Sequence, residues 1–241
     1  ARKSIEDTIE TVDINIKGTA NVLEASHQAK VKKVILASTV WVFNACKDHE
    51  NTKNKITLNE QSKLNPEGGG HFYTTSKIAS EMLCHDYKAL KNLNFTILRY
   101  GIPYGENMWP GLVLRSFVEN ALNKKPLIIN GDGSAKRRFI HVDDLARAHV
   151  LSLNETANNK IISLEGNHDT TIKELANLVS KYIPGTKVEF KIDESRKGEL
   201  NVENYEISNE YAKDLIKWRP LIEINEGVKN YIDWFKTVNT E

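Results

Sequence analysis

The sequence predicts an α/β fold, in which a doubly wound parallel sheet is followed by a smaller α+β domain. Short apolar runs alternate with stretches of helical periodicity in the first half, and this order favours parallel strands with helices on both faces. The second half mixes shorter strands with helices. Because the composition changes near Gly105, the predicted domains are residues 1–105 and 106–241.

Two strands and two helices are predicted in the first half. Residues 34–37 and 95–98 are apolar on both faces, as expected of strands buried between layers of helices. Helical spacing of apolar residues covers 12–30 and returns at 74–90. The polar stretch 47–70 is predicted to be a long loop, and loops of that length inside compact domains are often functional.

Turn and capping residues mark the elements of the second half. A Gly-Asp-Gly turn at 131–133 separates short strands, and Asp143 or Asp144 can cap the helix that follows. Thr171 stands three residues before Glu174, which is the spacing of a capping box. Strands are predicted at 127–129 and 139–142, and helices at 112–122, 208–216 and 225–235, with two more that end at 153 and 182.

Composition and charge exclude several classes of protein. The 241 residues carry a formal net charge of +1, which offers no electrostatic case for binding nucleic acid. No apolar run approaches the roughly 20 residues that cross a bilayer, and the start of the chain has no apolar signal core. We therefore expect no membrane association and a cytoplasmic location. Cys46 and Cys84 are expected to be free thiols in a reducing compartment.

A phenol and an ammonium are paired at the start of the helix expected at 74–90. Tyr73 and Lys77 stand four residues apart, so both side chains lie on one helix face. An adjacent cation stabilises a phenolate and lowers the pKa of a tyrosine, and Tyr73 could then take a proton from a hydroxyl. The spacing alone fits a surface lysine beside a half-buried tyrosine equally well.

Two hydroxyl side chains end the first predicted strand. Ser38 and Thr39 stand at its carboxyl end, which is where open α/β sheets bind ligands. Taken alone, they fit a turn or a helix cap. The order of strand, hydroxyl, loop and then Tyr73 with Lys77 is more specific, because Thr39 could hydrogen-bond the substrate oxygen that Tyr73 deprotonates.

With these residues the chain resembles the extended short-chain dehydrogenase/reductases, in particular the nucleotide-sugar epimerase/dehydratase group. The resemblance implies a Rossmann-like sheet and an NAD-dependent enzyme, and its motifs follow one another in the family's order over nearly the whole chain. The matching segments are 15–19 (Asn-Ile-Lys-Gly-Thr), 34–43, 73–77 (Tyr-Thr-Thr-Ser-Lys), 98–105, 131–144, 196–199 (Arg-Lys-Gly-Glu) and 218–220 (Trp-Arg-Pro).

The resemblance also implies roles for individual residues. The catalytic residues would be Thr39, Tyr73 and Lys77. The residues near NAD would be Asn15, Ser38, Tyr73, Lys77 and Tyr100. The residues that bind the nucleotide-sugar substrate would be Asn107, Arg137, Arg196 and Glu199, with the two arginines on the diphosphate, whose oxygens suit a guanidinium fork.

Other interpretations of several of these residues stay open. Arg137 and Arg138 could be solvated or paired with Asp143 and Asp144. The histidines His141 and His149 fit packing or capping better than catalysis. Core packing is the expected role of Trp218 and Trp234, whereas a substrate pocket is expected near Asn107 and Trp109.

The sequence departs from the family pattern in places that matter. The glycine-rich turn that the family places before the Asn15 segment is absent, so we expect a sheet that is incomplete at its N-terminal side. We also expect this polypeptide alone to bind NAD poorly and to have little activity. Val40 and Trp41 replace the Asp-Glu pair of the 4,6-dehydratases, and Ile102 replaces a substrate-contacting Asn.

The function that these features favour is an NAD-dependent nucleotide-sugar epimerase, similar to the UDP-glucose 4-epimerase type. NADP in place of NAD stays open. An NAD(P)-dependent reductase or dehydrogenase that uses the same three groups is an alternative, and so is a non-catalytic nucleotide-sugar-binding remnant. Family members commonly dimerise through two helices, which here resemble those after Asn15 and Tyr73, so a homodimer is expected.

Overall fold

The computed structural model describes residues 2–46, 55–67, 69–191 and 205–239, which divide into two compact units. The first change of unit lies between Gly101 and Ile102, close to the boundary predicted at Gly105, but the chain then returns to the first unit twice. The first unit comprises Ala1–Gly101, Arg147–Leu164 and Asn204–Arg219. The second comprises Ile102–Ala146, Glu165–Glu203 and Pro220–Glu241.

A parallel three-stranded sheet forms the centre of the first unit. Its strands lie in the order β1 (Val34–Thr39), β3 (Phe95–Tyr100) and β8 (Lys160–Leu164). The two strands predicted here are confirmed, but β1 is only partly buried over most of its length, because it lies at an edge of the described sheet. The central strand β3 is buried along nearly its whole length, as an interior strand should be.

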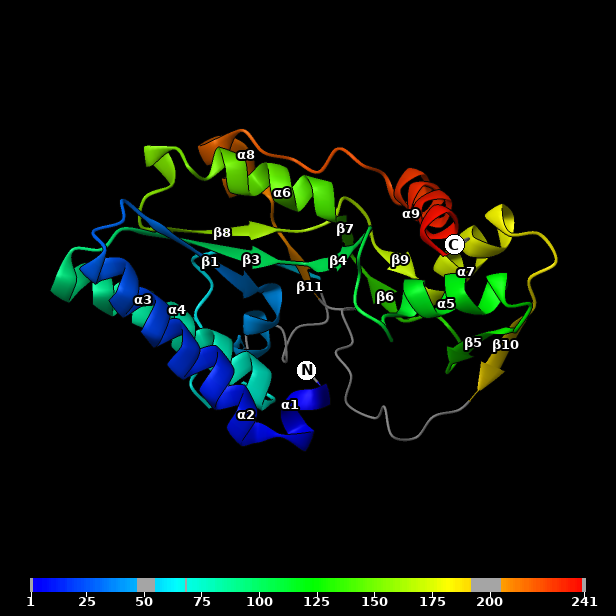
Figure 1. Ribbon diagram of the computed structural model, residues 1–241, viewed down its shortest axis with the longest axis horizontal. Coiled ribbons are helices and arrows are strands. Elements are labelled where there is room, and N and C mark those ends of the chain that lie inside the picture. The colour runs from blue at the N-terminus through cyan, green and yellow to red at the C-terminus, as the bar shows by residue number, and fades with distance from the viewer. Residues whose placement is uncertain (1, 47–54, 68, 192–204, 240–241) are drawn as a thin grey trace. The chain divides into compact units, whose positions relative to one another are not determined.

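Helices cover both faces of this sheet (Figure 1). On one face lie α3 (Gly18–Gln28) and α4 (Phe72–Lys91), and on the other lie α8 (Glu210–Ile216) and the second half of α6 (Val142–Leu151). The helix predicted at 12–30 is interrupted, since α2 continues through a π-helical turn into α3. The helices at the start of the chain are α1 (Arg2–Glu6), α2 (Thr8–Val12) and the π turn (Asp13–Lys17).

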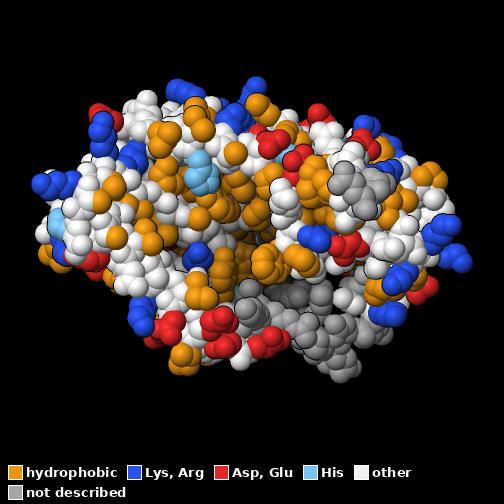
Figure 2. Space-filling view, in the orientation of Figure 1, with side chains coloured by type: hydrophobic (Ala, Val, Ile, Leu, Met, Phe, Trp, Pro, Cys, Tyr) orange, Lys and Arg blue, Asp and Glu red, His pale blue; other side chains and the backbone are white. Residues whose placement is uncertain are grey.

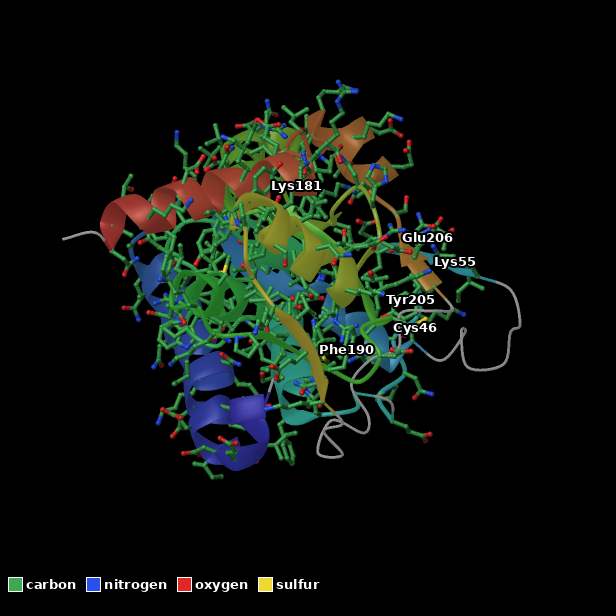
Figure 3. All side chains as sticks on the ribbon, turned by 90° about the vertical axis from the view of Figure 1, so that its right-hand side faces the viewer. Cys46, Lys55, Lys181, Phe190, Tyr205 and Glu206 are labelled. Atoms are coloured by element: carbon green, nitrogen blue, oxygen red, sulfur yellow. The ribbon has the colours of Figure 1, made fainter. Side chains whose placement is uncertain are left out.

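The long loop predicted at 47–70 contains a strand. The strand β2 (Ile56–Leu58) pairs in parallel with β11 (Tyr205–Ile207), far away in the sequence. The Lys55 ammonium lies 3.3 Å from a carboxylate oxygen of Glu206 beside this pair, as Figure 3 shows. A further 3₁₀ turn, Val40–Ala45, carries the chain away from β1.

Two-stranded pairings and helices build the described part of the second unit. The parallel pairs are β4 (Ile102–Tyr104) with β7 (Phe139–His141) and β5 (Leu127–Asn130) with β10 (Val188–Lys191). The antiparallel pair is β6 (Lys136–Arg137) with β9 (Thr170–Thr171). The helices are α5 (Val113–Leu122), α7 (Ile172–Tyr182) and α9 (Ile224–Val238), and they pack around an apolar core that includes Phe117, Leu127, Val179 and Tyr231.

The capping predictions have different outcomes. The capping box at the start of α7 is confirmed, because Thr171 accepts the Glu174 N–H and Glu174 accepts the Thr171 N–H. The helix α6 begins at Val142, so Asp143 and Asp144 lie in its first turn instead of before it. The Asp144 carboxylate accepts the backbone N–H groups of Leu221 and Ile222, at 3.0 Å each.

Three other expectations concern cysteines, tryptophans and membranes. Cys46 and Cys84 are both buried and free, as predicted. Trp218 is fully buried and Trp234 packs against the core of the second unit, which confirms their packing role. Within the described ranges, no helix is both long enough and apolar enough to cross a bilayer.

Candidate active site

The helix α4 places Tyr73 and Lys77 on one face, at the end of strand β1. The helix begins after His71, whose Nδ1 accepts the Thr74 N–H at 3.5 Å. Tyr73 lies in the first turn and Lys77 one turn later, so both side chains point to the same side. The pairing that the spacing predicts is therefore present in the structure.

Thr39 lies beside the phenol of Tyr73, close enough for its hydroxyl to lower the pKa of that phenol. It is the last residue of β1, and its Oγ1 already accepts the Trp41 N–H at 3.2 Å. That contact leaves the hydroxyl proton of Thr39 for the oxygen of Tyr73. Burial raises the pKa of Tyr73 above its usual value, and the hydroxyl of Thr39 opposes the rise.

The pKa of Tyr73 is raised, whereas the sequence predicts that it is lowered. Lys77 was expected to lower the pKa of Tyr73, but its Nζ lies 5.9 Å from the centroid of the Tyr73 ring. It donates instead to the carbonyl oxygen of Ala37, at 3.1 Å. Burial lowers the pKa of Lys77, while the charge of Glu81 raises it. The protein alone thus holds Tyr73 as a neutral phenol.

Asn15 is hydrogen-bonded to the start of α4. It lies in the π turn between α2 and α3, and its Nδ2 donates to the hydroxyl of Ser76 at 2.9 Å. That hydroxyl donates in turn to the carbonyl of Tyr73 at 2.8 Å. The carbonyl of Asn15 accepts the hydroxyl of Ser80 at 2.9 Å. Asn15 is therefore linked through Ser76 to the backbone carbonyl of Tyr73.

The two remaining residues expected near a cofactor end neighbouring strands. Ser38 is 3% exposed, and its hydroxyl donates to Glu81 at 2.5 Å. The phenol of Tyr100 lies 2.6 Å from a ring nitrogen of His149, and burial raises the pKa of Tyr100 to about 12. Since β1 and β3 are parallel neighbours, Ser38 and Tyr100 both lie at the carboxyl edge of the sheet.

The residues expected to bind substrate belong to the second unit or lie outside the described residues. Asn107 has a left-handed backbone, and the Arg137 Nη1 donates to the carbonyl of Lys136. Arg138 forms an ion pair with Asp169 at 2.7 Å. Arg196 and Glu199 are not among the residues that the structure describes.

The structure also shows two buried charges that the sequence did not reveal as part of the site. Glu81 and Arg99 form an ion pair, with 2.7 Å between Oε2 and Nη2. The available signals were the position of Glu81 one turn after Lys77 and the single charge of Arg99 in an apolar strand. No cluster of acidic, His or Cys side chains in the described part of the chain could hold a metal ion.

The first unit therefore brings together one carboxyl sheet edge, a phenol with a hydroxyl partner, and an ammonium on the same helix face. This arrangement is typical of an enzyme that moves protons at an alcohol or a carbonyl. The chain belongs to the NAD dependent epimerase/dehydratase family, an enzyme family of the extended short-chain dehydrogenase/reductases, whose model matches residues 1–164.

Curated relatives agree with this family. The chain is 30% identical to a putative UDP-glucose 4-epimerase of Methanocaldococcus jannaschii, and the alignment covers 99% of this chain and 74% of the relative. It is 32% identical to a UDP-glucuronate 4-epimerase of Thermodesulfobacterium geofontis, over 98% of this chain and 69% of the relative.

Solved structures have the same fold. A UDP-glucose 4-epimerase of Thermotoga maritima, solved with UDP-glucose, matches with a TM-score of 0.83 and 27% identity, over 98% of this chain and 74% of that one. A dTDP-glucose 4,6-dehydratase of Streptomyces venezuelae, solved with NAD, matches with a TM-score of 0.84 over 98% of this chain and 70% of that one. At 24% identity, the second comparison supports the fold alone.

Proposed function

We propose that this chain carries the chemistry of an NAD-dependent nucleotide-sugar epimerase. The observation that carries the proposal is the placement of Tyr73 and Lys77 on one face of α4 against the carboxyl end of β1, where Lys77 donates to Ala37 and Thr39 lies beside the phenol. Both curated relatives above are named as 4-epimerases, and this supports epimerisation of a sugar carbon.

Tyr73 is the proton-transfer group in this proposal. Its phenolate would take the proton of a sugar hydroxyl as a hydride leaves the same carbon, and the phenol so formed would return the proton to the carbonyl oxygen when the hydride comes back. The hydroxyl of Thr39 lowers the pKa of the phenol and so favours the phenolate when it forms. The charge of Lys77 favours the phenolate further when the ammonium comes closer to Tyr73.

The described residues fit NAD as the cofactor. A lysine ammonium has three donors, and among the described residues Lys77 donates to Ala37, which leaves donors for ribose hydroxyls. The residues that would hold NAD are Asn15, Ser38, Tyr73, Lys77 and Tyr100. When bound, NAD supplies a reversible hydride acceptor. These residues would meet NADP in the same way.

Dehydration is disfavoured by the residues that follow Thr39. The Asp-Glu pair that the resemblance associates with dehydratases is replaced by Val40 and Trp41. Val40 is 7% exposed and Trp41 offers no acid or base, so neither side chain can protonate a leaving hydroxyl. Epimerisation needs no such group.

A one-way reductase is the second candidate, and the raised pKa of Tyr73 favours it. A neutral phenol is ready to donate a proton to a carbonyl, which is the direction of reduction. Net consumption of NADH or NADPH with a 4-keto nucleotide sugar supports the reductase, because an epimerase recycles its cofactor. Binding of a nucleotide sugar without any turnover supports a non-catalytic remnant.

We also propose a homodimer formed through α3 and α4. Apolar side chains are exposed on these helices, and they include Val22, Met82 and Leu90. On the face of the molecule drawn in Figure 2, hydrophobic and charged side chains are interspersed. Light scattering coupled to size exclusion should give twice the chain mass for the wild type. Substituting Met82 and Leu90 with Lys should give the monomer mass, and an unchanged mass would reject this surface.

Replacing Tyr73 with Phe tests the enzyme proposal. UDP-glucose and UDP-glucuronate are the first substrates to assay, with the 241-residue chain and with any coding sequence upstream of Ala1 included. We expect Tyr73→Phe to reduce turnover by about 10²–10⁴-fold and to leave binding of the nucleotide sugar nearly unchanged, because only the proton-transfer group is lost. Tyr87→Phe, on the same helix but hydrogen-bonded to Glu24, is the matched control and should keep turnover. Full activity of Tyr73→Phe rejects the assignment.

A further inference from the structure

Three successive turns of α4 contact three consecutive residues of β1. Tyr73 lies beside Thr39, whose hydroxyl lowers the pKa of the phenol, and Lys77 donates to the carbonyl of Ala37 at 3.1 Å. One turn later, Glu81 accepts the hydroxyl of Ser38 at 2.5 Å. Residues four apart on a helix share one face, so α4 lies along the end of β1 through a row of polar contacts.

Glu81, which makes the last contact in this row, is also bound by a residue of the neighbouring strand β3. Arg99 of β3 donates to Glu81 through Nε at 3.0 Å and through Nη2 at 2.7 Å. Both side chains are almost entirely buried, and the guanidinium carbon of Arg99 lies 5.1 Å from the ring centroid of Phe43. A bidentate arginine contact fixes a carboxylate in both position and orientation.

We propose that Glu81, held by Arg99, is the positioning residue that fixes Tyr73 and Lys77 of α4 against Thr39. This inference rests on the proposed function, because it assigns Glu81 a task in the reaction of those three groups. Glu81 acts through the helix and through Ser38, and we assign it no contact with substrate.

Glu81 has a second effect, which is electrostatic. Burial favours the uncharged amine of Lys77, and the Glu81 carboxylate counteracts this preference from the same helix face. The ammonium therefore stays available to favour a phenolate at Tyr73. A well-packed apolar pair in place of a buried ion pair is often equally stable, so stability alone does not require Glu81 and Arg99 here.

The ionisation of Lys77 tests the proposal without any assay of activity. The amine of Lys77 reacts with acetic anhydride only when it is unprotonated, and mass spectrometry of peptides gives its labelling rate as a function of pH. For Glu81→Gln we expect the pH profile to move to lower pH and labelling at pH 8 to become roughly threefold faster or more. Asp86→Asn removes an exposed carboxylate of the same helix and should leave the profile unchanged.

A second variant covers the case in which Glu81→Gln does not fold. The double variant Glu81→Gln with Arg99→Met removes both charges together, and it should show the same shift of the Lys77 profile with a wild-type circular dichroism spectrum. An unchanged Lys77 profile in either folded variant overturns the proposal. A shifted profile in a chain whose Tyr73→Phe variant keeps full turnover supports the placement of Lys77 by Glu81 but rejects the proposed function.

Discussion

Among the described residues, the first unit buries more polar side chains than the second. In the first unit, polar groups are buried where α4 meets β1 and β3, and they include Ser38, Ser76, Ser80, Glu81 and Arg99. The core of the second unit is a cluster of aliphatic and aromatic side chains, with Leu127, Val179 and Val228 fully buried. The first unit is thus held at its active face by directional contacts, and the second by close packing.

The two kinds of burial have different effects: polar contacts fix the geometry of side chains, whereas apolar packing supplies stability. Apolar burial stabilises a fold in proportion to the area removed from water, but it tolerates small shifts. Hydrogen bonds and buried ion pairs add little net stability, but they have narrow geometry and a large penalty when one partner is lost. An active-site surface must hold a phenol, a hydroxyl and an ammonium in fixed relative positions. It therefore needs hydrogen bonds and buried ion pairs.

The largest expected effect on stability is a cavity in the second unit. Phe117 is 2% exposed and packs in the apolar core, so Phe117→Ala should lower the free energy of unfolding by about 3–5 kcal/mol. Urea denaturation measures this change. The Lys77 labelling profile belongs to the first unit and should stay at its wild-type position in the folded variant. A shift of that profile would contradict the separation of the two units.

Substitutions in the ion pair of the first unit should change the free energy of unfolding non-additively, unlike substitutions in an apolar core. Arg99→Met leaves the Glu81 carboxylate buried and unpaired, so it should cost about 3 kcal/mol in the free energy of unfolding. Adding Glu81→Gln removes that charge and should restore most of the loss. Urea denaturation of both single variants and the double variant measures the coupling. Losses that simply add would show that the two side chains act independently.

An effect spread over pH is expected from Glu165, a buried acid of the second unit. Burial raises the pKa of Glu165 from 4.5 to about 8, a rise that the charge of Arg138 opposes. Between these two values the folded chain keeps a proton that the unfolded chain releases. Stability contributed by this group is therefore complete below about pH 4.5 and is lost as pH rises towards about 8.

The expected slope is at most about 1.4 kcal/mol per pH unit. Glu165→Gln cannot release a proton, so its free energy of unfolding should fall less steeply than that of the wild type between pH 5 and pH 8. Denaturation at several pH values gives both curves. Parallel curves for the wild type and the variant would mean that Glu165 titrates normally.

The sequence predicted elements with a strong local signal and missed those that depend on distant partners. The strands β1 and β3 are apolar runs, and Thr171 with Glu174 is a local capping pattern, so these predictions are confirmed. The strand β8 was not predicted, because Lys160 and Ser163 interrupt its apolar pattern. The strands β2 and β11 are three residues each and exist only as a pair, which no local pattern reveals.

The same distinction holds for the candidate site. The spacing of Tyr73 and Lys77 and the position of Thr39 at a strand end are local features, and the structure brings all three together. The bond between Ser38 and Glu81 joins positions that are distant in the sequence, so it has no counterpart in any spacing rule. The direction of the pKa shift of Tyr73 was missed for a related reason, since burial is a property of the folded environment.

The π turn at Asp13–Lys17 sets the rotational phase between α2 and α3. One extra residue in a helical turn rotates everything before it by about 100° relative to a regular α-helix. Deleting one residue there would give a more regular helix, yet it would swing the amide of Asn15 around the helix axis and away from Ser76. The one extra residue of the π turn thus determines which side of the first helices faces Tyr73.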